Sequence, residues 1–237
     1  QGMGDELVAF ELLPRLAVEM VLEFIPGTRD PLPGAGTWFV LLEFAGASEQ
    51  AALDAQLEGF LTTALSDGLL SDAALAASEA QRAAFWSVRH GVSEAQKGAG
   101  ASIKHDVSVP ITRVPEFLAR ADALMHAAVP GIRPVAFGHL GDGNLHYNLS
   151  QPTYMSANAF LARWDELSEQ VHSLAVGLGG SFSAEHGVGS LKTGELERLK
   201  SAVELDLMRR IKRAFDPQGI MNPGKVLVSP GPGLSSG

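Results

Sequence analysis

Two glycine-rich segments carry the residues of this 237-residue chain that are best suited to chemistry. Segment 138–148 (GHLGDGNLHYN) contains two histidines and an aspartate, and segment 183–189 (SAEHGVG) contains a glutamate followed by a histidine. Imidazole nitrogens and carboxylate oxygens are common protein ligands of Zn²⁺, Fe²⁺ and Mn²⁺. The two segments together predict a metal site with an adjacent proton acceptor.

The spacing of His139 and His146 suggests that they bind one cation. Asp142-Gly143, midway between them, is a favoured two-residue hairpin turn, which would set the two histidines directly opposite each other. Opposed side chains share a face, with Cβ atoms ~4.5–5.5 Å apart, so both imidazoles reach one ion. Glu185 is the predicted third ligand. Two histidines and one carboxylate leave coordination positions open, as in catalytic sites.

His186 follows Glu185 directly, so in an extended chain its side chain points the other way. This predicts a general base beside the metal, acting on a metal-bound hydroxyl. Two plainer interpretations stay open. The histidines of the hairpin hydrogen-bond within a polar seam, or His186 marks the entry to a helix.

The composition limits the classes of function. The formal net charge of −9 disfavours nucleic acid and anionic membranes as partners. The absence of cysteine excludes disulfides, thiolate metal sites and cysteine nucleophiles. No apolar run reaches the ~18–20 residues of a membrane helix, so we expect a soluble protein, with the cytoplasm as the default compartment. The start, Gln1 to Gly4, resembles an internal or tag-derived beginning.

The elements that must position these residues alternate between strands and helices. Strands are predicted at 37–44 and 101–109, and a hairpin at 133–149. Helices are predicted at 48–66, 78–97, 114–128, 157–178 and 195–215. Residues 8–24 mix helical and apolar character. This order predicts an α+β fold, an antiparallel sheet with helices packed mainly on one face, followed by a C-terminal helical segment.

Five motifs carry a family resemblance over almost the whole chain, from Phe10-Glu11 to Lys225. They are GHLGDGNLHYN and SAEHGVG, with FDPQGIMNPGK at 215–225, FWSVRHGVSEA at 85–95 and KHDVSVP at 104–110. The chain resembles the C-terminal half of FAD-linked oxidases and dehydrogenases of the vanillyl-alcohol oxidase class. That resemblance implies a ferredoxin-like cap. Leu140, Tyr147 and Ala184 favour the D-2-hydroxyglutarate dehydrogenase branch over the glycolate oxidase branch.

The resemblance implies a role for each motif residue. The metal ligands are His139, His146 and Glu185, the base is His186, the substrate-binding residues are Arg89, Ser93, Lys104 and Asn148, and the cofactor-binding residue is Asn222. A guanidinium and an ammonium suit a carboxylate-bearing substrate, although without the resemblance ordinary surface salt bridges are the simpler interpretation. His90 and His105 depart from the acid and the tyrosine usual in the branch, and either change would alter the substrate pocket.

The implied reaction is oxidation of a D-2-hydroxy acid, such as 2-hydroxyglutarate, lactate or malate, to the 2-oxo acid. The implied cofactors are FAD and a divalent metal, zinc first, then manganese or iron. We expect residues 1–193 to form the substrate- and metal-binding domain, 194–228 a C-terminal helix and flavin-returning tail, and 229–237 a frayed end. The FAD-binding domain, normally in the same polypeptide, is expected to be missing here, which would leave this piece inactive alone.

Other functions remain open on the sequence. A glycolate oxidase-type subunit has similar motifs. A 2-His-1-carboxylate iron oxygenase fits the ligand set, although the element order lacks the many short strands of a jelly roll. A non-catalytic module that binds a metal or a hydroxy acid is a third alternative. The sequence leaves open the electron acceptor, a protein or a quinone, and whether the chain forms a homodimer.

Overall fold

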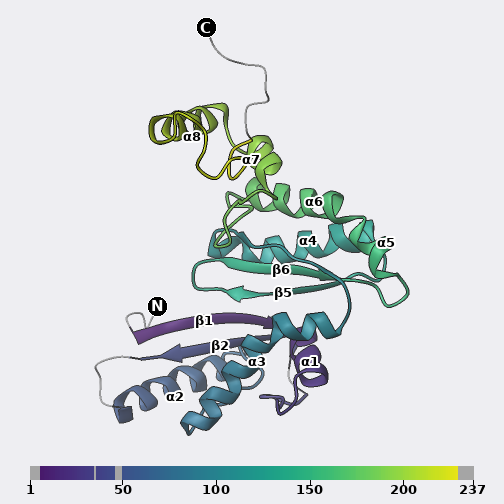
Figure 1. The fold of residues 1–237 in the computed structure, drawn as a ribbon. Helices are drawn as coiled ribbons and strands as arrows, with labels where there is room; N and C mark the ends of the chain where they lie inside the picture. Colours follow the sequence, from purple (N-terminus) through teal and green to yellow (C-terminus); the bar gives the residue numbers. More distant parts are fainter. Residues whose placement is uncertain (1–5, 35, 46–49, 229–237) are drawn as a thin grey trace.

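The computed structural model describes residues 6–34, 36–45 and 50–228 (Figure 1). Its strands are β1 (Leu7–Pro14), β2 (Trp38–Phe44), β3 (Ser102–Ile103), β4 (Val107–Ser108), β5 (Arg133–His139) and β6 (Asn144–Ser150). Its α-helices are α1 (Arg15–Phe24), α2 (Gln50–Ser66), α3 (Glu79–Gly98), α4 (Val114–Ala128), α5 (Ala157–Leu161), α6 (Trp164–Gly177), α7 (Thr193–Leu199) and α8 (Ala202–Phe215). A short 3₁₀ helix, Ile111–Arg113, precedes α4.

The strands form one antiparallel sheet in the order β2-β1-β5-β6-β3, and β4 also pairs with β6. The predicted α+β class is therefore confirmed. β1 pairs with β5 through Glu11 opposite His139 and Leu12 opposite Gly138. This pairing brings the first described strand against the hairpin that carries the motif histidines.

Helices cover both faces of the sheet, which refines the expectation that they lie mainly on one. Because side chains alternate along a strand, Leu12 faces the core around α4 and α6, and Leu13 faces the core around α1 and α3. Figure 1 shows α4 and α6 beside β5 and β6, with α1 and α3 on the other side of the sheet. The hairpin therefore has an apolar core on each side.

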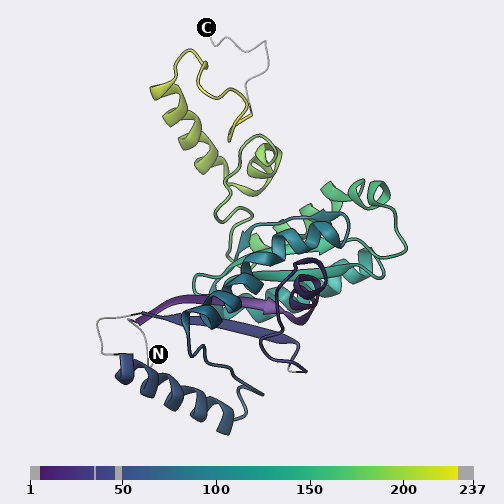
Figure 2. The ribbon, with the colours of Figure 1, turned by 60° about the horizontal axis from the view of Figure 1, so that its bottom comes forward.

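The C-terminal helices lie beyond α6 and away from the sheet in both ribbon views (Figure 1, Figure 2). A small cluster of Phe182, Leu196 and Leu205 anchors them to the rest of the domain. The tail after α8 returns to this cluster, since Leu227 packs on it and the Val226 N–H donates to the Gly189 carbonyl, 2.7 Å away. No helix among the described residues is long and apolar enough to cross a membrane.

Several predicted elements are divided in the structure. Segment 8–24 is a strand followed by a helix, and the change falls at Pro14, whose extended backbone precedes the first turn of α1. Segment 101–109 is two short strands separated by residues 104–106 rather than one. The helix predicted at 195–215 breaks before Ser201. The side chains of Ser201 and Glu204 form a capping box that starts α8.

The long helix predicted at 157–178 is likewise two helices, α5 and α6, which meet at residues 162–163. The helix predicted at 48–66 is α2, which begins at Gln50, and residues 46–49 lie outside the described part of the chain. The expected frayed end, 229–237, also lies outside it. Strand β1 is thus an element that the sequence reasoning did not assign, whereas the other differences divide or shift elements whose order is as expected.

Candidate active site

The hairpin β5–β6 sets the positions of two motif histidines, although its register differs from the prediction. Phe137 pairs with His146, so the loop is Leu140–Gly143 rather than Asp142-Gly143 alone. The Asp142 carboxylate accepts a 3.0 Å hydrogen bond from the Asn144 N–H, which favours this wider turn.

A shift of two residues keeps every side chain on its face, whereas a shift of one would reverse it. The two histidines therefore stay on one face, as diagonal rather than opposed neighbours. The ring centroids of His139 and His146 are 6.0 Å apart. The predicted shared face is correct, and the predicted direct opposition is wrong.

The Glu185 carboxylate lies among three imidazoles. Its Oε1 is 3.3 Å from His146 Nε2 and 3.6 Å from His186 Nε2, and its Oε2 is 3.8 Å from His139 Nε2. Potential ligand atoms of Asp106, His146, Glu185 and His186 all lie within 4.8 Å of one another. The structure thus groups two of the predicted metal ligands, His146 and Glu185, with the predicted base His186 and with Asp106. The third predicted ligand, His139, lies beside this group, with its Nε2 3.8 Å from Glu185 Oε2, but is not a member of it.

Asp106 holds the loop that carries Glu185. Its Oδ2 accepts hydrogen bonds from the backbone N–H groups of Ala184 at 3.1 Å, and of Glu185 and His186 at 2.8 Å each. Burial acts to raise the Asp106 pKa, but these hydrogen bonds and the nearby positive charges outweigh it, so the pKa lies below its usual value. Its other oxygen, Oδ1, is buried without a hydrogen-bond partner among the described residues.

This loop is bent rather than extended, because one carboxylate gathers three consecutive N–H groups. The His186 ring therefore lies on the same side as Glu185, stacked on His146 with centroids 5.5 Å apart. His186 is one of the four residues in the group of potential metal ligands. The prediction that its side chain points the other way from Glu185 assumed an extended chain, and the bend in the loop makes that part of the prediction wrong.

Glu11, on β1, is a site residue that the sequence reasoning did not identify. Its Oε1 lies 2.6 Å from His139 Nδ1, and its Oε2 lies 2.6 Å from Arg89 Nε. The side chain is only 4% exposed. The available signal was a single acidic residue inside the apolar segment VAFELLP, where an uncompensated charge would be costly.

Arg89, on α3, lies beside this cluster. Its guanidinium is 5.0 Å from the Phe137 ring, which in turn lies 5.1 Å from the His146 ring. Burial, more than any charge, lowers the His146 pKa, and the Arg89 charge lowers it further, although Glu185 acts in the opposite direction. A lowered pKa favours neutral His146, the form that binds metals.

The other predicted substrate and cofactor residues are not joined to the cluster by any contact found in the described ranges. Ser93 and Lys104 are exposed, on α3 and between β3 and β4. Asn148 is buried, donating to Gln96 Oε1 at 2.8 Å and accepting from the His105 N–H at 3.2 Å. Asn222 is exposed in the tail, with a left-handed φ of 46°.

The two family departures lie away from the cluster. His105 is fully buried, with Nδ1 donating to the Tyr147 carbonyl at 2.7 Å and Nε2 accepting from Ser168 Oγ at 3.1 Å. His90 stacks on Trp86, with ring centroids 5.1 Å apart. Neither side chain has a contact with the histidine–glutamate cluster in the described part of the chain.

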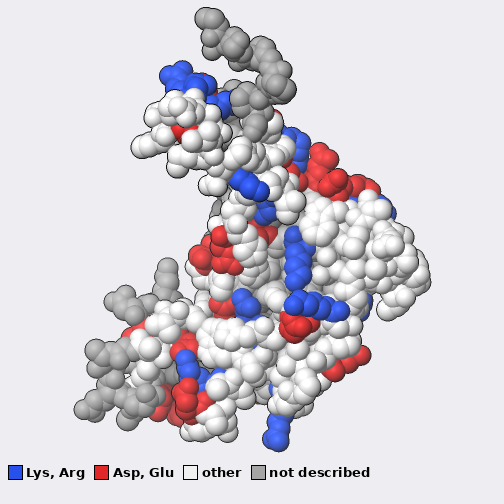
Figure 3. Space-filling view, in the orientation of Figure 1, with Lys and Arg blue, Asp and Glu red and all other residues white. Residues whose placement is uncertain are grey.

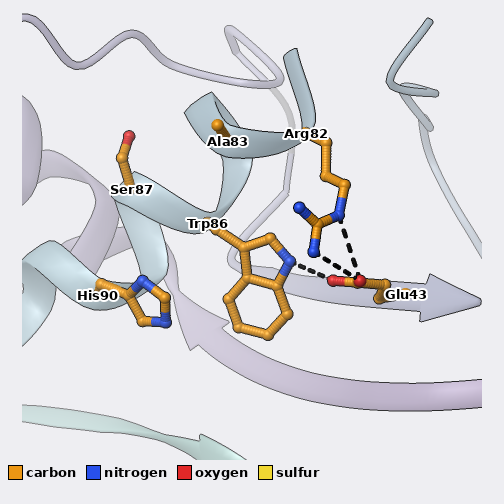
Figure 4. A pocket seen from close by; sticks show the side chains of 6 residues that line it. All are labelled: Glu43, Arg82, Ala83, Trp86, Ser87 and His90. Atoms are coloured by element: carbon orange, nitrogen blue, oxygen red, sulfur yellow. Dashed lines mark hydrogen bonds and ion pairs between the residues drawn. The ribbon is translucent and has the colours of Figure 1, made fainter. Parts of the chain in front are cut away.

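His90 lines a separate surface cavity of about 460 Å³, together with Trp86, Ser87 and Arg82 (Figure 4). In this cavity Glu43 accepts hydrogen bonds from the Trp86 indole N–H and from the Arg82 guanidinium. Figure 3 shows acidic and basic side chains interspersed over the face in view, and the described residues there form no broad basic surface.

Three imidazoles and a carboxylate beside a buried guanidinium define a domain suited to binding a cation together with a small organic anion. The family model for the C-terminal domain of FAD-linked oxidases matches residues 2–226, and the chain belongs to this family. It is 39% identical over 220 residues to a D-2-hydroxyglutarate dehydrogenase of Xanthomonas citri pv. viticola, which covers 93% of the chain and 46% of that protein.

Two further relatives have related names. The mitochondrial D-2-hydroxyglutarate dehydrogenase of Arabidopsis thaliana is 35% identical over 231 residues, 96% of the chain and 39% of that protein. The D-2-hydroxyglutarate–pyruvate transhydrogenase of Saccharomyces cerevisiae is 30% identical over 233 residues, 95% of the chain and 46% of that protein. The chain thus spans less than half the length of these three relatives.

Proposed function

We propose that this chain is the substrate- and metal-binding part of an FAD-dependent dehydrogenase that oxidises a D-2-hydroxy acid to the 2-oxo acid. The observation that carries the proposal is the grouping of His146, Glu185 and His186 with Asp106, with His139 Nε2 3.8 Å from Glu185 and Arg89 close by. The family match and the names of the relatives favour D-2-hydroxyglutarate over lactate or malate.

The cluster fits a divalent cation. The Glu185 carboxylate approaches the three imidazoles at 3.3–3.8 Å, longer than good hydrogen bonds and close enough for an ion to be shared among them. The buried Asp106 Oδ1 is also unsatisfied among the described residues. We propose that His139, His146 and Glu185 hold the ion, zinc first and then manganese or iron, since imidazole nitrogens suit zinc and iron and carboxylates suit manganese. A cation held there lowers the pKa of a coordinated hydroxyl.

The residues around this site divide the remaining work. The bound flavin supplies the hydride acceptor for the substrate C2 hydrogen. His186 accepts the hydroxyl proton on its imidazole, so that loss of hydride and proton leaves a carbonyl at C2. Arg89 binds a substrate carboxylate, and Ser93, Lys104 and Asn148 contribute to the rest of the substrate pocket. The exposed Ser93 and Lys104 become pocket walls once the flavin-binding domain covers them.

A row of exposed apolar side chains supports a domain partner. Val203, Leu207, Ile211 and Phe215 recur every fourth residue along α8 and are 52–81% exposed. Such a row lies on one helix face and is typical of an interaction surface. We propose that the flavin-binding domain packs on this row, with Asn222 in the adjoining tail turned toward the flavin. The electron acceptor, a protein or a quinone, takes electrons from that domain.

The alternatives predict different measurements. An iron oxygenase would consume O₂ without flavin, and a glycolate oxidase-type subunit would prefer glycolate. A binding module would take up a hydroxy acid without turnover even when joined to the flavin domain. The cluster of histidines and Glu185 is compatible with all three alternatives, but membership of the FAD-linked oxidase family favours the dehydrogenase.

Metal analysis of the full-length enzyme tests the proposal, with His146→Ala beside the wild type. The expected result is about one divalent metal per wild-type chain, lost in the variant together with D-2-hydroxy acid oxidation. His126→Ala is the matched control, because this exposed histidine on α4 interacts with Asp122 and is not among the potential metal ligands found in the described residues. A wild type that stays metal-free after reconstitution, yet oxidises the substrate at full rate, would overturn the metal assignment.

A further inference from the structure

Glu11 joins two parts of the site that are far apart in sequence. One carboxylate oxygen contacts Arg89 Nε and the other contacts His139 Nδ1, each at 2.6 Å. Glu11 lies on β1, Arg89 on α3 and His139 at the end of β5. The contact exists because Glu11 is paired with His139 in the sheet and the same strand face is covered by α3.

The contact to His139 determines which ring nitrogen carries the proton. A carboxylate only accepts hydrogen bonds, so Nδ1 must hold the hydrogen. In a neutral ring, Nε2 then presents its lone pair, and it is Nε2 that lies 3.8 Å from Glu185 Oε2. Glu11 therefore holds His139 in the tautomer and orientation required of a metal ligand.

The contact to Arg89 determines which guanidinium nitrogens remain available. Glu11 uses Nε, and no partner of the two terminal nitrogens is found among the described residues. These two nitrogens form the edge of the guanidinium that binds a carboxylate bidentately. The same carboxylate thus orients the edge that a substrate anion would meet.

We propose that Glu11 is a positioning residue that couples the metal site to the anion site, through His139 on one side and Arg89 on the other. The proposal rests on the proposed function for the identity of the two ligands. Removing Glu11 weakens both sites at once, although Glu11 touches neither ligand.

The chain contains a matched control for this arrangement. Glu43, on β2, accepts from the Arg82 guanidinium and from the ring N–H of Trp86, just as Glu11 accepts from Arg89 and a ring nitrogen of His139 (Figure 4). Arg82 and Arg89 lie on the same helix, α3. Glu43→Gln removes a carboxylate with the same two kinds of partner from a more exposed setting, 21% against 4% for Glu11, that lacks the metal cluster.

The test compares Glu11→Gln and Glu43→Gln in the full-length enzyme. A glutamine has one acceptor oxygen and one NH2 group. If the NH2 faces Arg89, that hydrogen bond is lost; if it faces His139, it donates to Nδ1 and reverses the tautomer. The bond that remains is weakened by the loss of the negative charge. Zn²⁺ affinity, measured by competition with a chelator, is expected to fall about 10- to 100-fold in Glu11→Gln. The substrate KM is expected to rise as well, and Glu43→Gln is expected to change neither quantity more than about twofold.

A double-mutant cycle separates positioning from general destabilisation. If Glu11 acts on the metal through His139, then Glu11→Gln causes no further loss of Zn²⁺ affinity in a His139→Asn background. Full additivity in that cycle, or unchanged Zn²⁺ affinity in folded Glu11→Gln, would overturn the proposal. A wild type that binds no Zn²⁺ contradicts the proposed function instead, so the two failures are distinguishable.

Discussion

Glu185 Oε1 lies 3.3 Å from His146 Nε2, although the two residues are separated by two helices in the chain. The approach depends on a third residue, Asp106, which fixes the backbone of 184–186 opposite the hairpin. The cluster is therefore a property of the sheet and its flanking loop together. It follows that changes outside the histidines will alter it.

Asp106→Asn is expected to loosen the loop that carries Glu185. The amide keeps the shape of the side chain but loses the charge that strengthens three hydrogen bonds from the backbone. We expect the free energy of unfolding to fall by about 2 kcal/mol and the metal affinity to fall with it. Chemical denaturation and chelator competition measure the two effects. Asp142→Asn, in the exposed hairpin turn, is the control, and equal effects of both variants would contradict this role of Asp106.

Gly180→Ala is expected to destabilise the segment that leads into the loop at 184–186. A Cβ at this position would lie 1.8 Å from the Ser108 carbonyl oxygen, so the paired backbones must separate. Overpacking of this kind costs about 1–3 kcal/mol. Gly177→Ala has nothing within 4 Å and lies in α6, where alanine is favoured, so its stability should hold or rise. Thermal unfolding of the pair checks the contrast, which fails if both alanines are tolerated.

His105 is expected to make the domain sensitive to acid. Burial, followed by the nearby His172 charge, lowers its pKa from 6.5 to about 3 in the folded protein. The neutral form is therefore favoured on folding. Its contribution is full above pH 6.5 and is lost as the pH falls toward 3, because only the unfolded chain then takes up the proton.

Between pH 7 and pH 5 this loss amounts to about 2 kcal/mol. Denaturant unfolding at both pH values should show a correspondingly smaller drop for His105→Gln, which stays neutral. The exposed His126→Gln serves as the control for a general effect of removing a histidine. An identical pH dependence of wild type and His105→Gln would show that folding does not lower the pKa of this imidazole.

Leu207→Asp combined with Ile211→Asp is expected to weaken FAD retention by the full-length enzyme. Both side chains are more than half exposed on α8, so the charges disturb a domain contact more than the fold of this chain. The flavin absorbance that remains after gel filtration measures the effect. Leu124→Asp, on α4 and 41% exposed, is the comparison. Normal flavin content in the α8 variant would place the flavin-binding domain on another surface.

Local patterns were sufficient to predict much of this domain. Alternation in 144–149 correctly separates Leu145, Tyr147 and Leu149, which enter the core, from the face that carries His146. The residue types of the two glycine-rich motifs and the family resemblance predicted His139, His146, Glu185 and His186 as one site, and the structure places them close together. The prediction for the strand succeeds because strand periodicity acts over a few neighbouring positions.

Only the tertiary structure decided the hairpin register, the bend of the loop at 184–186 and the role of Glu11. The register depends on packing around Gly143, whose added Cβ would lie 2.0 Å from the Val109 carbonyl. The bend depends on Asp106, which lies 78 residues before Ala184. Glu11 reaches Arg89 and His139 across 78 and 128 residues. Such contacts arise from the packing of the whole sheet, which no local pattern in the sequence contains.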